Sequence, residues 1–241
     1  MNSPVSESEP GPEIRAIIFD MDGCLVDSEP LSLEAVAAEM RASGLRDATA
    51  AEVGTKYLGV SLAKIAKDVE AQLGKPCAPG FADRMEARLF AAYESGLRQM
   101  DGVEDMLRLL NQAGIPVAIA SGASVRRLEK TLKIARLDGY FGNRGFSADL
   151  VRRGKPAPDI FLLAAEKLGV APQNCAVLED SPHGIMGAVT AGMWTVGFVG
   201  GSHLAGREAD HTAILRAAGA HQVIGHLSQA LAALVPARAR L

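Results

Sequence analysis

The sequence predicts an α/β fold in which a doubly wound parallel sheet carries a second, smaller domain made only of helices. From residue 98 onward, short apolar runs alternate with helical patterns, which is typical of parallel strands joined by helices. Residues 14–20 are a further apolar run, rich in Ile, and predict a strand buried on both faces. Between them, residues 30–97 show helical spacing of apolar side chains and no convincing strand.

These patterns divide the chain into a core of residues 14–29 and 98–241 and a helical insertion of residues 30–97. Residues 1–13 combine Pro, Ser and Glu and are expected to form a disordered leader. Pro30 is suited to the first turn of the first inserted helix, and glycines close several later helices. After the insertion we expect helices at residues 103–113, 124–134, 158–168, 182–190, 211–218 and 227–234, and strands at 115–120, 143–147, 175–178, 194–199 and 222–224.

The composition excludes several classes of protein. With 241 residues, of which 48% are hydrophobic and 22% charged, the chain can bury a sizeable core. The 25 basic and 28 acidic residues form no basic stripe, so we expect no nucleic-acid partner. Residues 181–206 carry no charged side chain, but their glycines favour a buried helix and strand over a membrane span.

The three cysteines, Cys24, Cys77 and Cys175, are widely spaced and form no C-x-x-C pair. This usage is typical of free thiols in a reducing compartment. The N-terminus also lacks a basic segment followed by an apolar one, as a secretory signal would require. We therefore expect a cytoplasmic protein.

Reactive side chains follow the predicted strands where each strand ends. Asp20 and Asp22 follow the first strand and, two residues apart on an extended chain, point to the same side. Ser121 and Gly122 follow the second strand. Taken alone, each pattern is more often an ordinary loop or helix cap, but ligands of parallel sheets bind at this edge.

Lys155 precedes a helix, and Glu179 and Asp180 follow a later strand, so they are expected at the same edge. Several carboxylates in one crevice repel each other, which favours a bound cation. Because the candidate ligands are oxygen atoms, the cation that fits best is Mg²⁺.

Residues 19–29 (FDMDGCLVDSE), Ser121, Lys155 and the Glu179-Asp180-Ser sequence resemble the four motifs of the haloacid dehalogenase-like superfamily. The resemblance spans residues 14 to about 234. Residues 184–193 (GIMGAVTAGM) are similar to the sugar-phosphatase and β-phosphoglucomutase-like branch, and the helical insertion resembles the cap domain of that branch. The superfamily has a Rossmann-like core, which agrees with the fold expected from the strand pattern.

The resemblance implies a phosphatase that forms an aspartyl-phosphate. Asp20 would be the nucleophile, and Asp22 would be the general acid and then the general base. Mg²⁺ would be held by Asp20, the Asp22 carbonyl, Asp180 and, directly or through water, Glu179. Ser121 and Lys155 would also be catalytic and would bind the phosphate, together with the backbone of Gly23 and Gly122, and Lys155 would keep Asp20 ionised.

The roles of some residues stay open from the sequence alone. Glu29 and its neighbour Ser28 lie where the core meets the insertion, and either a substrate contact or a hinge role is expected. His183 is expected to be an ordinary loop residue, whereas His203 could line the crevice. Cys24 is expected to be a small filler, and the other histidines show no metal-ligand spacing.

Four functions are in competition. Dehalogenation or phosphonate cleavage is disfavoured because Asp22 is present, whereas the branches of the superfamily that catalyse those reactions replace that acid. A non-catalytic module is disfavoured because Asp20, Lys155 and Asp180 are all present. A sugar phosphomutase of this branch carries a lysine and an arginine around a Gly-Val-Ser turn, where Leu58 and Leu62 stand here, and a histidine where Ser32 stands. We therefore expect a monomeric hydrolase of small sugar or sugar-acid phosphates, with 6-phosphogluconate the first to test, and the mutase as the alternative.

Overall fold

The computed structural model describes residues 12–57 and 62–236, which form two compact units. The sheet unit contains the residues up to Leu25 and from Gln99 onward, and the helical unit is Val26–Arg98. The expected leader lies almost wholly outside the described residues. Glu13 is described, and its carbonyl accepts a hydrogen bond from the Asn174 side chain at 2.7 Å.

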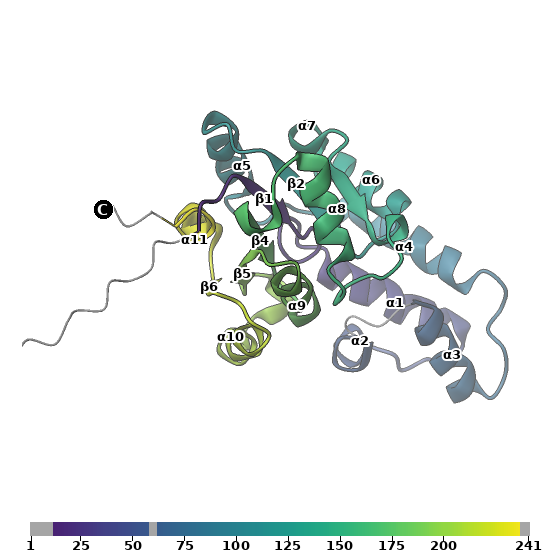
Figure 1. The fold of residues 1–241 in the computed structure, drawn as a ribbon. Helices are drawn as coiled ribbons and strands as arrows, with labels where there is room; N and C mark the ends of the chain where they lie inside the picture. The colour runs from purple at the N-terminus through teal and green to yellow at the C-terminus, as the bar shows by residue number, and fades with distance from the viewer. Residues whose placement is uncertain (1–11, 58–61, 237–241) are drawn as a thin grey trace, which may run out of the picture. The chain divides into compact units, whose positions relative to one another are not determined.

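The sheet unit is built on six parallel strands in the order β3-β2-β1-β4-β5-β6, which confirms the predicted fold class (Figure 1). The first strand of the chain thus lies in the middle of the sheet, between β2 and β4. The strands are β1 (Ala16–Phe19), β2 (Val117–Ser121), β3 (Gly145–Ser147), β4 (Cys175–Glu179), β5 (Trp194–Phe198) and β6 (Gln222–Ile224).

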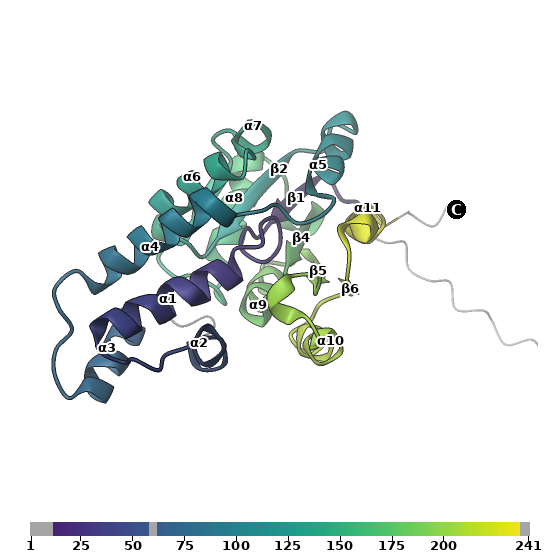
Figure 2. The same ribbon diagram turned by 180° about the vertical axis from the view of Figure 1, so that it is seen from behind.

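Helices cover both faces of this sheet. Figure 1 shows α8 and α9 in front of the strands, and Figure 2 shows α5 and α6 from the other side. The helices of the sheet unit are α5 (Val103–Gln112), α6 (Val125–Ile134), α7 (Asp138–Phe141), α8 (Asp159–Leu168), α9 (Pro182–Thr190), α10 (Glu208–Ala217) and α11 (Ala230–Leu234), with short 3₁₀ turns at Ala148–Leu150, Pro172–Asn174, Ser202–Leu204 and Leu227–Gln229.

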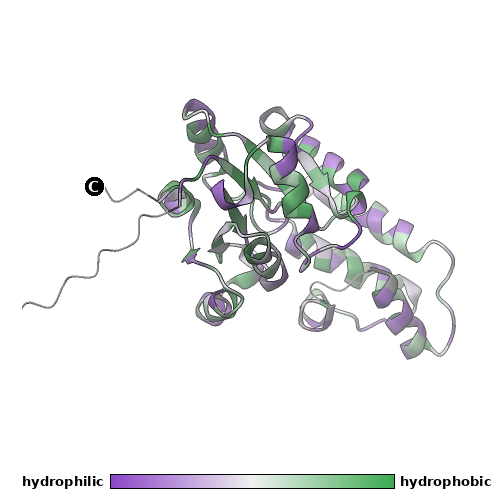
Figure 3. Ribbon diagram, viewed as in Figure 1, coloured by the Kyte–Doolittle hydropathy of each residue, from purple (hydrophilic) through white to green (hydrophobic). Residues whose placement is uncertain are grey.

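The strands are buried on both faces, so their side chains alternate between two apolar layers. Ile18 of β1 packs in a cluster with Phe161 of α8 and Ala188 of α9. Phe19, its neighbour, makes an edge-to-face contact with Phe141 of α7, with ring centroids 6.3 Å apart. In Figure 3 the strands accordingly form the hydrophobic centre of the sheet unit.

The uncharged stretch from residue 181 to 206 forms α9 and β5, as predicted. None of the helices in the described part of the chain is long and apolar enough to cross a membrane. Several bounds differ from the prediction by one to three residues: β2 begins at Val117, β3 at Gly145 and α10 at Glu208, and residues 227–229 form a 3₁₀ turn before α11. The four-residue α7 was not predicted, because one turn shows no periodicity.

The helical unit consists of α1 (Glu29–Ser43), α2 (Ala50–Tyr57), α3 (Leu62–Leu73) and α4 (Phe81–Gly96). Helix α1 packs along α4 and also contacts α2. The Glu39 carboxylate on α1 is buried and accepts hydrogen bonds from Arg84 Nε at 2.8 Å and Arg88 Nε at 2.9 Å, both on α4. One buried carboxylate thus joins the two longest helices of this unit. The sequence places its boundaries at 29/30 and 97/98, and its role as a cap stays a prediction.

Candidate active site

The predicted reactive residues of the sheet unit meet because of the strand order. Asp20 follows β1, while Ser121 and Glu179 are the last residues of the neighbouring β2 and β4. Phe19 is in register with Ile119 of β2 and Leu178 of β4. The carboxyl ends of the three central strands therefore open onto one edge, where parallel sheets bind ligands.

Lys155 links the carboxylates of two of these strands. Its ammonium donates hydrogen bonds to Asp20 Oδ1 at 2.5 Å and to Glu179 Oε2 at 2.6 Å. The other oxygen of Glu179 accepts from the Ser181 backbone N–H at 3.0 Å and from the Ser181 hydroxyl at 2.8 Å. Both carboxylate oxygens of Glu179 are thus engaged by protein donors.

Helix α9 begins next to the ion pair of Lys155 and Glu179. The Ser181 hydroxyl caps the helix by accepting the Gly184 N–H at 3.0 Å. A Cβ on Gly184 would lie only 1.9 Å from Glu179 Oε2. Glycine is therefore required at this position for Glu179 to reach Lys155.

Burial and mutual repulsion shift the pKa values of this cluster. Burial, followed by the charge of Glu179, raises the pKa of Asp20 from 3.8 to about 8, against the opposing effect of Lys155. Burial by itself would lower the pKa of Lys155, but the charges of Asp20 and Glu179 outweigh it and raise that pKa well above its usual range. One ammonium thus faces two carboxylates, and Lys155 favours the ionised form of Asp20 while Glu179 opposes it. That Lys155 keeps Asp20 ionised stays a prediction.

The residues at this edge fit a bound cation. Among the described residues, one group of donor atoms is compact enough to hold a metal ion, and it consists of Asp20, Cys24 and Asp180, within 4.8 Å of one another. Burial, followed by the charge of Asp180, raises the pKa of the Cys24 thiol, so the carboxylates are the anionic donors. Gly23 lets Asp180 approach, because a Cβ on Gly23 would lie 2.0 Å from Asp180 Oδ2. Carboxylate oxygens are ligands that hard cations prefer.

Asp22 has a cationic neighbour that the sequence analysis missed. Arg127 Nη2 lies 3.1 Å from Asp22 Oδ1. Arg127 belongs to the first turn of α6, the helix that follows Ser121 and Gly122. A cation in the helix after a reactive loop is the one sequence signal that could have pointed to it.

Two histidines border Asp180. His203 Nε2 lies 3.5 Å from Asp180 Oδ2, and the His203 side chain is buried, so it lies at the site, as one of its two readings suggested. His211 Nε2 lies 2.6 Å from the Asp180 carbonyl oxygen, to which it donates. No local pattern singles out His211, because only the fold brings α10 to Asp180. His183 is exposed, but it lies in the first turn of α9 and not in a loop as expected.

The remaining candidates differ in their surroundings. The Ser121 side chain is buried and its hydroxyl accepts the Ala123 N–H at 3.1 Å, while Gly122 is exposed. Cys24 is buried beside the site. Glu29 begins α1 in the helical unit, and a contact with substrate stays a prediction.

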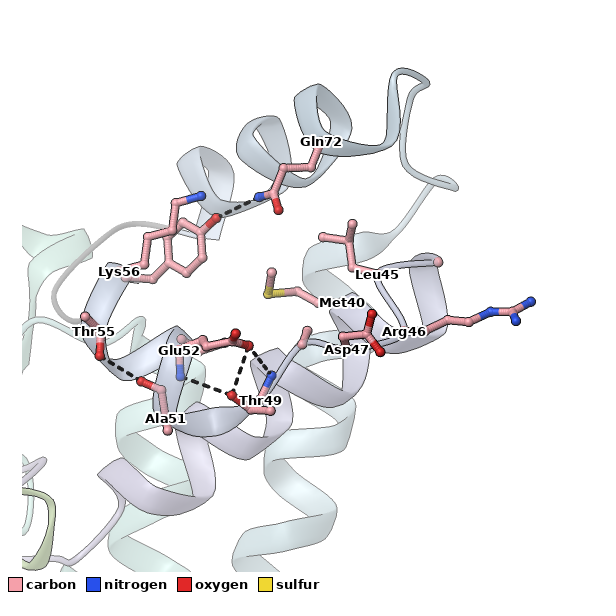
Figure 4. Close-up of a pocket in the computed structure, with 14 residues that line it drawn as sticks. Met40, Leu45, Arg46, Asp47, Thr49, Ala51, Glu52, Thr55, Lys56 and Gln72 are labelled. Carbon is pink, nitrogen blue, oxygen red and sulfur yellow. Dashed lines mark hydrogen bonds between the residues drawn. The ribbon is translucent and has the colours of Figure 1, made fainter.

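The helical unit has a cavity of its own, of about 840 Å³ (Figure 4). Tyr57 and Gln72 close one side of it, where the Gln72 amide donates to the Tyr57 hydroxyl at 3.2 Å. None of the predicted catalytic or metal-binding residues lines it.

A parallel α/β sheet with a buried Asp-Lys-Glu cluster and further acidic side chains at its carboxyl edge is the kind of arrangement that enzymes use for phosphoryl transfer. Comparison with known families makes this specific: residues 14–192 match the haloacid dehalogenase-like hydrolases, and the chain belongs to that family.

Individual relatives are phosphatases and related proteins. The chain is 34% identical to hexitol phosphatase A of Escherichia coli (strain K12), over 74% of this chain and 80% of the relative. A family hydrolase from Deinococcus radiodurans R1, solved with bound phosphate and sodium, is 31% identical with a TM-score of 0.76 and covers 93% of this chain and 96% of that one. A putative β-phosphoglucomutase from Thermotoga maritima is 28% identical with a TM-score of 0.71, over 88% and 94% of the two chains. The protein is thus a phosphoric monoester hydrolase of the branch expected from the sequence.

Proposed function

We propose that the chain is a Mg²⁺-dependent phosphatase that hydrolyses small sugar or sugar-acid phosphates through a phosphorylated Asp20. The observation that carries this proposal is the buried Asp20 carboxylate at the end of the central strand, held by Lys155, with Asp22 two residues later. The kinship to a hexitol phosphatase favours a polyol or sugar phosphate as the substrate.

In the first step, a carboxylate oxygen of Asp20 attacks phosphorus, and the bond from phosphorus to the alcohol oxygen breaks. Asp22 gives its proton to the departing oxygen, so that the alcohol leaves neutral. The product on the enzyme is an aspartyl-phosphate.

In the second step, water attacks the same phosphorus while Asp22 takes one proton from it. The bond between phosphorus and Asp20 breaks, and inorganic phosphate and the free Asp20 carboxylate result. Lys155 holds Asp20 in place through both steps, and Glu179 holds Lys155.

Asp20, Asp180 and the Asp22 carbonyl would hold Mg²⁺, with Glu179 as an outer ligand. When bound, Mg²⁺ neutralises charge on the phosphoryl group and lets a carboxylate approach it. The Ser121 hydroxyl and the backbone N–H groups of Gly23 and Gly122 would bind phosphate oxygens beside Lys155.

Net hydrolysis is favoured over the mutase alternative. A mutase must hold a second phosphate, which requires fixed cations. Leu58 lies outside the described residues and Leu62 begins α3, and both are leucines in the sequence where such cations would be expected. We also infer a cytoplasmic monomer, from the free thiols and the size of the chain.

The proposal is tested by phosphate release from hexitol phosphates, sugar phosphates and 6-phosphogluconate. The wild-type protein should turn over at least one of them with Mg²⁺ and not with EDTA. Asp20→Asn should lose at least about 10³-fold in kcat, because the nucleophile is removed, while the far-ultraviolet circular dichroism stays unchanged.

Two results would contradict the proposal. Substantial activity of Asp20→Asn would remove Asp20 as the nucleophile. Conversion of β-glucose 1-phosphate plus a trace of the 1,6-bisphosphate to glucose 6-phosphate, faster than any phosphate release, would establish the mutase.

A further inference from the structure

The two aspartates of the first loop have different cationic neighbours. Lys155 donates to Asp20 at 2.5 Å, whereas Arg127 Nη2 lies 3.1 Å from Asp22 Oδ1. The side chains of Arg127 and Asp22 are only 21% and 16% exposed, so solvent screens the pair weakly. We propose that Arg127 is a positioning residue that holds the Asp22 carboxylate for its proton transfers. This inference rests on the proposed function.

The backbone of α6 fixes the base of the Arg127 side chain. The Arg127 N–H donates to the hydroxyl of Ser124, the N-cap residue, at 3.2 Å. Its carbonyl accepts from the Thr131 hydroxyl at 2.7 Å. The guanidinium therefore extends to Asp22 from the first turn of a capped helix.

Arginine suits this task chemically. A guanidinium stays protonated throughout the working pH range, so it orients a carboxylate without exchanging a proton with it. A fixed contact at Asp22 Oδ1 sets the direction of the carboxylate that gives a proton to the departing alcohol and takes one from water. Lys155 is occupied by Asp20 and Glu179 and does not serve Asp22 in this way.

A different role, in which Arg127 binds the phosphate itself, makes other predictions. Loss of a direct phosphate contact would weaken every substrate alike and would not depend on Asp22. Loss of a positioning contact would slow the esters whose leaving group needs a proton. The leaving group therefore separates the two roles.

The test compares kcat/KM for the best alkyl phosphate with kcat/KM for p-nitrophenyl phosphate, because this parameter reports the steps through loss of the leaving group. An alkoxide needs the proton of Asp22, but p-nitrophenolate leaves without it. Arg127→Met should lower kcat/KM at least about 10-fold for the alkyl ester, a part of the 10²–10⁴ that a positioned acid contributes. For p-nitrophenyl phosphate it should lower kcat/KM less than about 3-fold. Arg127→Lys, which keeps the charge, should fall between.

The matched control is Arg126→Met, which removes the same charge from the exposed neighbouring position. Arg126→Met should leave kcat/KM unchanged for both the alkyl phosphate and p-nitrophenyl phosphate. The second measurement is a double-mutant cycle: in an Asp22→Asn background, Arg127→Met should change the alkyl-ester rate less than about 2-fold, because the group that it positions is gone.

Three outcomes would overturn the inference. Equal losses for both esters, or an undiminished loss in the Asp22→Asn background, would make Arg127 a substrate-binding residue. Wild-type kcat/KM for both esters in both Arg127 variants would remove Arg127 from the site. Failure of the proposed function itself is separate, because it would appear as an active Asp20→Asn or as an Asp22→Asn variant with no leaving-group dependence.

Discussion

Asp180 is held at both ends, since His211 donates to its carbonyl oxygen and His203 lies beside its carboxylate. In the proposed enzyme, this bracing would hold the Asp180 carboxylate next to Asp20 as a ligand for Mg²⁺. A site held in advance in this way binds a metal without reordering its ligands.

Asp180→Asn should therefore weaken Mg²⁺ binding more than it weakens the fold. Replacing the charged donor by a neutral amide should raise the half-saturating Mg²⁺ concentration at least about 10-fold. Calorimetric titration of the metal-free protein with Mg²⁺ measures this directly. Asp105→Asn, at an exposed residue of α5, should not change the titration, and an unchanged titration of Asp180→Asn would exclude Asp180 from the metal site.

At this scale, the sequence predicted residues that lie beside strand ends and missed residues that arrive from elsewhere. Asp20, Ser121 and Glu179 were predictable because strand order alone brings them to one edge. Arg127 and His211 come from helices whose side chains reach across loops. For Arg127 the local sequence offers only its place in the helix after a reactive loop, and for His211 it offers no signal. The roles of all five stay predictions.

Among the elements, the start of β5 depends on a histidine. The Trp194 ring stacks on the His221 ring at 4.3 Å between centroids, and the Trp194 indole donates to the Ala233 carbonyl at 2.8 Å. The Thr195 N–H donates to His221 Nδ1 at 3.0 Å, which requires an unprotonated nitrogen. These contacts join β5 to α11 and to the turn before β6.

This arrangement predicts a loss of stability in mild acid. Burial lowers the pKa of His221 below its ordinary 6.5, so the unfolded chain takes up the proton more readily than the folded one. The resulting stabilisation is complete above pH 6.5 and is lost as the pH falls below it. The urea midpoint should therefore drop between pH 7.5 and pH 5, and it should drop less in His221→Gln.

The exposed His183 offers the control, since His183→Gln should retain the wild-type pH dependence. Parallel curves for wild type and His221→Gln would show that His221 does not contribute. The strands and the helices of about ten residues were predictable because apolar runs and helical spacing are local patterns, and even the three-residue β6 was predicted. Helix α7 is a single turn without such a pattern, and Phe141 in it packs on Phe19.

The whole molecule consists of two units that are stabilised by different means. The sheet unit relies on apolar strands buried on both faces, whereas the helical unit also relies on the buried Glu39 between two arginines. Removing the charge of Glu39 leaves donors facing a neutral amide, which accepts only on its oxygen. The loss of stability should therefore be confined mainly to the helical unit.

Glu39→Gln should lower the free energy of unfolding by about 1–3 kcal/mol, the usual cost of an unsatisfied buried polar group. Hydrogen exchange should accelerate in α1 and α4 and stay unchanged in β1 and β4. The exposed Glu34, which pairs with Arg41 on the same helix, offers a control, because Glu34→Gln should change the stability within error. Equal changes in the free energy of unfolding for the two variants would mean that the buried Glu39 contributes no more to stability than the exposed Glu34.

The helical unit begins and ends at neighbouring points of the backbone. The Met100 N–H donates to the Leu25 carbonyl at 2.9 Å, and the Asp27 N–H donates to the Arg98 carbonyl at 2.9 Å. The two segments that connect the helical unit to the sheet unit are therefore hydrogen-bonded to each other. An insertion with coincident ends is a module: its length and composition can drift over evolutionary time, or be exchanged for another segment, while the six strands keep their order. The residues at the strand ends can then stay in place while the insertion changes.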